Sequence, residues 1–159
     1  MAERIIVGIS DFQLVQRPDK LITFALGSCV GIALYDRASG LSGMAHIMLP
    51  ASNLIKHDHN LKKFADTAIP LMYQAMLAKG AHSYQMIAKI AGGAMLFGQT
   101  DTMKIGERNV QAVKQELRLL GLRLVAEDTG KNYGRTMELD SIDGKVTIKT
   151  ALHGVQELL

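Results

Sequence analysis

The chain has 159 residues, of which 18 are basic and 15 acidic, and its formal net charge is +3. These charges are spread along the chain without a block of about five or six of one sign, which argues against a nucleic-acid-binding protein. The single cysteine excludes an intramolecular disulfide and suits a reducing compartment. No signal peptide is recognised, and the apolar runs fall short of the roughly 20 residues that cross a bilayer, so we expect a cytoplasmic protein without direct membrane insertion.

The first half of the chain predicts strands and one helix. Strands are expected at residues 5–9 and 21–35, the second interrupted by Gly27-Ser28, and residues 41–49 should close a hairpin with it. Apolar residues at helical spacing predict a helix over residues 61–79, which either kinks or begins at Pro70.

The second half of the chain also predicts strands and one helix. A strand at 85–90 leads into a glycine-rich segment, 91–94, that we expect to be a flexible loop. A strongly periodic helix is predicted from Ile105 to Gly121, and strands are predicted at 122–128, 136–139 and 146–150. No repeat or linker divides the chain, so we expect one domain over residues 1–159, an α/β or α+β layered fold with a mixed sheet.

The predicted hairpin places Cys29 and His46 on partner strands. If the chain reverses midway between Arg37 and Ala38, the two residues are directly opposite, with Cβ atoms roughly 4.5 to 5.5 Å apart. A reversal one residue later would make the pair diagonal or place one side chain on the other face. Histidine can accept a thiol proton near neutral pH, so this spacing predicts a nucleophile and its base.

The residues around Cys29 fit that chemistry. Gly27 and Gly31 leave space beside the thiol, and backbone N–H groups near Gly27 and Ser28 are candidate donors to an oxyanion. Thr23 lies six residues before Cys29 and is a candidate to orient the imidazole ring. These parts indicate acyl transfer at an amide or ester carbonyl. The alternative, an inert core cysteine beside a core histidine, stays open on residue types alone.

Several blocks in this order resemble the CheD family of chemoreceptor glutamine deamidases. The blocks that carry the resemblance are Leu26-Gly27-Ser28-Cys29-Val30, Gly43-Met44-Ala45-His46-Ile47-Met48-Leu49-Pro50, Ala91-Gly92-Gly93-Ala94, Ile105-Gly106-Glu107-Arg108-Asn109, and residues 127–135. One departure is Ala45, where the family commonly has a polar residue.

The resemblance implies a three-layer α/β/α sandwich with a mixed, largely antiparallel sheet. It implies Cys29 as nucleophile, His46 as general base and acid, and Thr23 as the residue that orients His46. The implied substrates are glutamines of methyl-accepting chemotaxis receptors, at membrane receptor arrays, and no metal or organic cofactor is implied.

Two other functions stay open. The family also includes members that bind and stimulate a CheC-type phosphatase, so the chain is alternatively a regulatory binding module with little deamidase activity. The third possibility is another thiol acyl-transfer enzyme, such as a methylesterase.

Overall fold

The structure is a computed structural model, which describes residues 1–98 and 102–159. Its strands are β1 (Arg4–Ile6), β2 (Asp11–Val15), β3 (Lys20–Leu26), β4 (Val30–Asp36), β5 (Ser42–Ile47), β6 (Met86–Gly92), β7 (Arg123–Thr129), β8 (Arg135–Asp140), β9 (Val146–Thr150) and β10 (Gly154–Leu158). Its helices are α1 (Ala65–Ala78) and α2 (Ile105–Leu119), with short 3-10 turns at Ser52–Leu54 and Ser83–Gln85. No helix of the described residues is long and apolar enough to cross a membrane.

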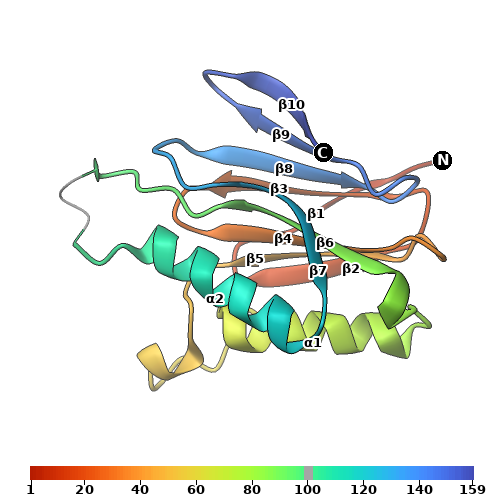
Figure 1. Ribbon diagram of the computed structural model, residues 1–159, viewed down its shortest axis with the longest axis horizontal. Coiled ribbons are helices and arrows are strands. Elements are labelled where there is room, and N and C mark those ends of the chain that lie inside the picture. Colours follow the sequence, from red (N-terminus) through yellow and green to blue (C-terminus); the bar gives the residue numbers. More distant parts are fainter. Residues whose placement is uncertain (99–101) are drawn as a thin grey trace.

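The strands form two sheets that pack face to face. The outer sheet has the order β1-β3-β8-β9-β10 and the central sheet the order β2-β5-β4-β6-β7. One core cluster lies between the two sheets, and a second lies between the central sheet and both helices. The layers are therefore helices, central sheet and outer sheet, as Figure 1 shows with the helices at the bottom.

The predicted mixed, largely antiparallel α/β architecture is confirmed, because the only parallel strand pairs among the described residues are β1–β3 and β6–β7. The α/β/α order of layers is not found. Both described helices contact the central sheet and each other, and the outer sheet has no described helix on its far side. The third layer is therefore a sheet.

Residues 21–35 were predicted to be one interrupted strand, and this prediction is wrong because they form two strands in different sheets. β3 belongs to the outer sheet and β4 to the central sheet, so the chain crosses between the sheets at residues 27–29. The crossing follows a local irregularity: Ala25 has a φ of 59°, and the pairing of β3 with β8 shifts between Thr23 and Leu26. Cys29 consequently lies at a sheet-to-sheet crossing.

The hairpin of β4 and β5 reverses one residue later than predicted. Asp36 N–H donates to the Leu41 carbonyl at 2.9 Å, which closes a loop of residues 37–40, and Gly40 takes a φ of +78°. The buried Asp36 carboxylate accepts hydrogen bonds from Ala38 N–H and the Ser39 hydroxyl, which stabilises this longer turn. His46 therefore pairs with Gly31, and the predicted direct pairing with Cys29 is wrong.

Other boundaries agree more closely. The α2 helix and strand β9 match their predictions, whereas β2 and β10 were not predicted. The α1 helix begins at Ala65 and continues through Pro70, so it does not begin at the proline.

Candidate active site

Thr23 and His46 meet between the two sheets. Thr23 comes from β3 of the outer sheet and His46 from β5 of the central sheet, and both are fully buried. The Oγ1 atom of Thr23 lies 2.7 Å from Nδ1 of His46. The contact thus runs across the layer between the sheets, whereas the sequence predicted Thr23 on one long strand with Cys29, beside the strand of His46.

The partners of the Thr23 hydroxyl determine which imidazole nitrogen carries the proton. The hydroxyl has one proton, and it donates that proton to the Val7 carbonyl at 2.8 Å. It must therefore accept the hydrogen bond from His46, which assigns the proton of the neutral ring to Nδ1. The lone pair of Nε2 is left to accept a proton, and Nε2 is buried without a hydrogen-bond partner among the described residues.

Cys29 faces the same layer as His46. Its half-buried side chain packs against the cluster between the sheets. A Cβ on Gly31, the residue opposite His46, would meet the outer-sheet side chains of Met137 and Leu26 at 2.7 and 3.1 Å, so that position also faces the outer sheet. Cys29 lies two residues earlier and is the diagonal neighbour of His46, a relation that separates Cα atoms by roughly 7 to 8 Å.

Burial shifts the pKa values of Cys29 and His46 in the directions that disfavour a thiolate–imidazolium ion pair. Desolvation lowers the pKa of His46 to about 4 and raises the pKa of the Cys29 thiol, an effect that the backbone N–H of Cys29 partly offsets. At neutral pH the resting pair is therefore a thiol and a neutral imidazole. If the sulfur is to attack a carbonyl, its proton would have to move to Nε2 in the same step, which is how a general base acts.

The segment 91–94, predicted to be a flexible loop, instead bonds to the backbone around Cys29. Ala91 and Gly92 complete β6, Gly93 N–H donates to the Cys29 carbonyl at 2.8 Å, and Ala94 N–H donates to the Gly27 carbonyl at 2.8 Å. A Cβ on Gly92 would lie 2.2 Å from the Cys29 carbonyl oxygen, so only glycine permits this approach.

The start of α2 supports the same region. A Cβ on Gly106 would lie 2.4 Å from the Ala94 carbonyl oxygen, so the helix packs against the segment that holds Cys29. Asn109, one turn further along, is fully buried and donates to the carbonyls of Ser28 and Met48, each at 2.9 Å. From the sequence, Asn109 was singled out only as the last residue of the block from Ile105 that carries the family resemblance, without a role beside Cys29. A further signal was its polar side chain at an inward-facing position of a periodic helix.

The two backbone candidates for an oxyanion hole differ. Gly27 N–H donates to the Ala25 carbonyl at 3.1 Å and is therefore engaged. Within the described residues, neither Ser28 N–H nor Cys29 N–H donates to another residue, although the Cys29 amide contacts its own thiol. The amides of Ser28 and Cys29 are thus the better placed donors.

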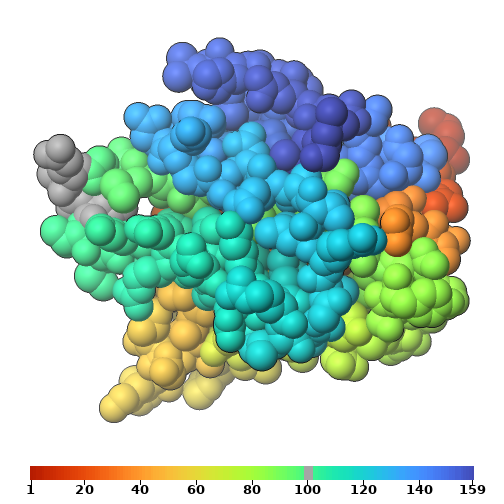
Figure 2. Space-filling model, in the orientation of Figure 1, coloured from red at the N-terminus to blue at the C-terminus, as the bar shows by residue number. Residues whose placement is uncertain are grey.

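Exposed apolar side chains lie beside the crossing. Leu96 approaches Gly27, since a Cβ there would meet its Cδ1 at 2.7 Å, and Leu96 remains half exposed. Phe97 and Met48 are also exposed. Figure 2 shows the neighbouring chain around residues 52–60 projecting from the body below α2. The described surface beside the crossing therefore includes exposed apolar side chains.

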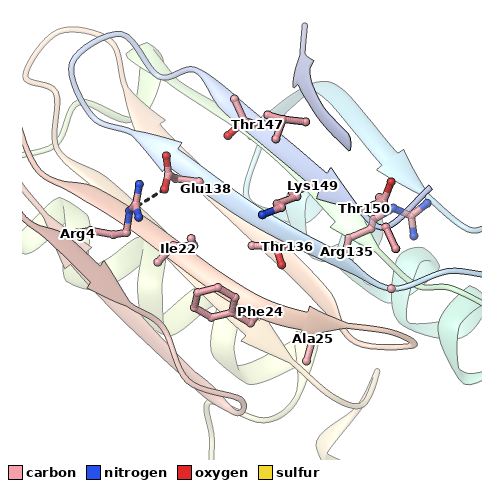
Figure 3. Close-up of a pocket in the computed structure, with 13 residues that line it drawn as sticks. Arg4, Ile22, Phe24, Ala25, Arg135, Thr136, Glu138, Thr147, Lys149 and Thr150 are labelled. Atoms are coloured by element: carbon pink, nitrogen blue, oxygen red, sulfur yellow. Dashed lines mark ion pairs between the residues drawn. The ribbon is translucent and has the colours of Figure 1, made fainter. Parts of the chain in front are cut away.

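A large hollow of the described surface lies elsewhere, on the far face of the outer sheet. Its volume is about 730 Å³, and Ile22, Phe24 and Lys149 line it, with Arg4 and Glu138 paired at 2.9 Å (Figure 3). Ile22 and Phe24 alternate along β3 with Thr23, which points to the opposite face. The hollow is thus separated from Cys29 and His46 by the sheet itself.

Comparison with known proteins identifies the class to which this fold and site belong. A family profile described as CheD chemotactic sensory transduction matches residues 48–150. That range begins after Cys29 and His46, so the profile match alone does not bear on them.

Similar proteins extend the match over nearly the whole chain. The chain is 52% identical over 155 residues to a probable chemoreceptor glutamine deamidase CheD of Clostridium botulinum (strain Eklund 17B / Type B), with 96% of each chain covered. Proteins of the same name from Caldanaerobacter subterraneus subsp. tengcongensis and Syntrophomonas wolfei subsp. wolfei are 50% and 48% identical, with 94% and 97% of this chain and 94% and 98% of theirs covered. The chain belongs to the CheD family.

Proposed function

We propose that this protein hydrolyses the side-chain amides of specific glutamines on methyl-accepting chemoreceptors, which yields glutamate and ammonia. The observation that carries the proposal is the inter-sheet site, in which Thr23 presents the lone pair of His46 Nε2 on the face where Cys29 lies. The relatives named chemoreceptor glutamine deamidase supply the substrate class.

In the proposed acylation, the Sγ atom of Cys29 attacks the glutamine Cδ while His46 Nε2 takes the thiol proton. The carbonyl oxygen becomes an oxyanion, and the amides of Ser28 and Cys29 donate to it. His46 then delivers its proton to the amide nitrogen, the C–N bond breaks, and ammonia leaves. The product is a thioester between Cys29 and the receptor side chain.

Deacylation, the hydrolysis of the thioester, completes the proposed reaction. His46 takes a proton from water, the hydroxide attacks the thioester carbonyl, and the C–S bond breaks. The proton returns to Sγ, so the net reaction is glutamine plus water to glutamate plus ammonia. Thr23 acts throughout by holding the Nδ1–H tautomer and the ring orientation.

The apolar rim supports a protein substrate. Leu96 and Met48 offer exposed apolar surface near Cys29, and the exposed Phe97 follows Leu96 in the chain, as expected for docking of a receptor helix that presents a glutamine at its surface. We propose that the protein acts in the cytoplasm and is recruited to membrane receptor arrays through this docking.

The test is to incubate the protein with receptor cytoplasmic fragments and to follow glutamine-to-glutamate conversion by peptide mass spectrometry. Wild type should convert defined glutamines, and Cys29→Ala and His46→Ala should abolish conversion. Failure of folded wild type to convert any glutamine of several receptors would overturn the proposal. Binding to a CheC-type phosphatase, the remaining interpretation of the family resemblance, would then be measured.

A further inference from the structure

Asn109 of α2 lies at the end of the hairpin where the strands separate. The last ladder pair of β4 and β5 is Val30 with Ile47, so the next pair in register would be Cys29 with Met48, and both lie outside the strands. At this point the two N–H groups of the Asn109 amide donate to Ser28 and Met48 carbonyls. The side chain therefore joins the two chain segments just where the ladder ends.

These two segments carry the reacting groups. Ser28 directly precedes Cys29, and Met48 follows His46 by two residues on the continuation of β5. A single planar amide bonded to both carbonyls limits how far the segments can move apart. The position of Cys29 relative to His46 is thereby linked to Asn109.

The helix that carries Asn109 is itself held in place. Gly106 packs against the carbonyls of Gly93 and Ala94 at distances that would exclude a Cβ, and the amides of the same two residues hold the Cys29 and Gly27 carbonyls. The nucleophile segment is thus held from one side by the end of β6 and from the other by Asn109.

The energetics of Asn109 favour a specific role over simple packing. Its Oδ1 atom is buried without a hydrogen-bond partner among the described residues, which is unfavourable. An apolar residue would fill the space without that penalty but would leave both carbonyls unbonded. The two hydrogen bonds that the amide donates therefore offset the unpaired Oδ1 atom.

We infer that Asn109 is a positioning residue, which sets the geometry between Cys29 and His46 by bridging the Ser28 and Met48 carbonyls. This inference rests on the proposed function, since it assigns a role for that same pair. A displacement of about 1 Å in such a pair reduces turnover on the order of 100-fold.

The first test measures alkylation of Cys29 by iodoacetamide as a function of pH, which needs no receptor because the chain has one cysteine. Asn109→Ala should change the alkylation rate or its pH profile in folded protein. Val113→Ala is the matched control, because Val113 is a fully buried residue of α2, one turn further on, in the helix-facing cluster. It should lower stability without altering the profile.

A double-mutant cycle distinguishes positioning from general support. If Asn109 acts through the pair, the effect of Asn109→Ala on alkylation should disappear in a His46→Ala background. The same effect in both backgrounds, or a wild-type profile in folded Asn109→Ala, would overturn the inference. If Asn109→Ala is unfolded in buffer, the cycle is measured in trimethylamine N-oxide, which favours the compact state.

Receptor deamidation supplies the second measurement. Asn109→Ala should lower kcat on the order of 100-fold and change KM much less, because Asn109 bonds to the backbone carbonyl of Met48 and not to its rim side chain. If wild type does not deamidate receptors but the alkylation cycle shows coupling, the proposed function fails while Asn109 still positions the pair. If wild type deamidates and the cycle shows no coupling, only the role of Asn109 fails.

Discussion

The two faces of the central sheet differ in chemistry although the same strands form both. Val30, Ile32 and Leu34 of β4 face the helices within a cluster of apolar side chains. The alternate positions of the same strands face the outer sheet. There β5 contributes His46, and Cys29 lies on the segment that leads into β4. The helix-facing layer therefore stabilises the sheet, whereas the inter-sheet layer holds Cys29 and His46, the proposed reactive groups.

The largest expected effect separates activity from stability in the inter-sheet layer. Cys29→Ala should lower receptor deamidation by at least about 10⁴-fold, because the nucleophile is lost. The free energy of unfolding should change by only about 1 kcal/mol, since the side chain is half buried. Mass spectrometry and denaturant titration measure the two quantities. A variant that keeps its activity would remove Cys29 from the mechanism.

On the helix-facing side of the central sheet, we expect a substitution to lower stability without lowering activity. Ile32→Ala should lower the free energy of unfolding by about 2 to 5 kcal/mol, because a fully buried side chain leaves a cavity. The fraction that stays folded should keep its kcat. A large loss of kcat at full folding would show that the two layers are not separable.

The pH dependence of stability sharpens the comparison. The folded pKa of His46 is about 4 and the unfolded one is about 6.5, so between these values the unfolded state binds a proton that the folded state excludes. Stability from this group is complete above pH 6.5 and is lost as the pH falls toward 4. Between pH 7 and pH 5 wild type should lose about 2 kcal/mol more than His46→Gln, measured by denaturant titration. Equal losses in the two proteins would contradict the burial of a neutral His46.

A smaller effect tests the contact between the sheets. Thr23→Val should lower kcat about 10- to 100-fold, because His46 Nδ1–H loses its acceptor and the ring loses its fixed tautomer. The unpaired Val7 carbonyl should cost about 1 to 3 kcal/mol of stability. Thr23→Ser, which keeps the hydroxyl, is the control. Equal kcat values for the two variants would show that the hydroxyl has no part in catalysis.

Cys29 and His46 could be proposed as a pair from the sequence because the signals that point to them are local to one hairpin. A cysteine between glycines and a histidine at hairpin spacing can be recognised without a structure. The predicted register of the β4–β5 hairpin was wrong. The observed register depends on the hydrogen bonds of the Asp36 carboxylate with Ala38 and Ser39 and on the left-handed conformation of Gly40. The one-residue difference moved Cys29 from the opposite to the diagonal position.

The contacts between distant segments were not predictable from pattern. The mostly apolar run over residues 21–35 gives no indication that the chain changes sheets between Thr23 and Cys29, and only this crossing brings β3 over β5. The support from Gly92 and Asn109 likewise depends on residues more than 60 positions from Cys29, which come close only when β6 and α2 pack on the sheet.

The most direct test of the central claim is to look for the covalent intermediate. Wild type is mixed with a receptor cytoplasmic fragment, quenched in acid within milliseconds, and analysed by intact mass spectrometry. The account predicts a transient species with the mass of both chains less one ammonia, linked through Cys29 and absent from Cys29→Ala. Deamidation that proceeds at the wild-type rate in Cys29→Ala, with no such species, would contradict it.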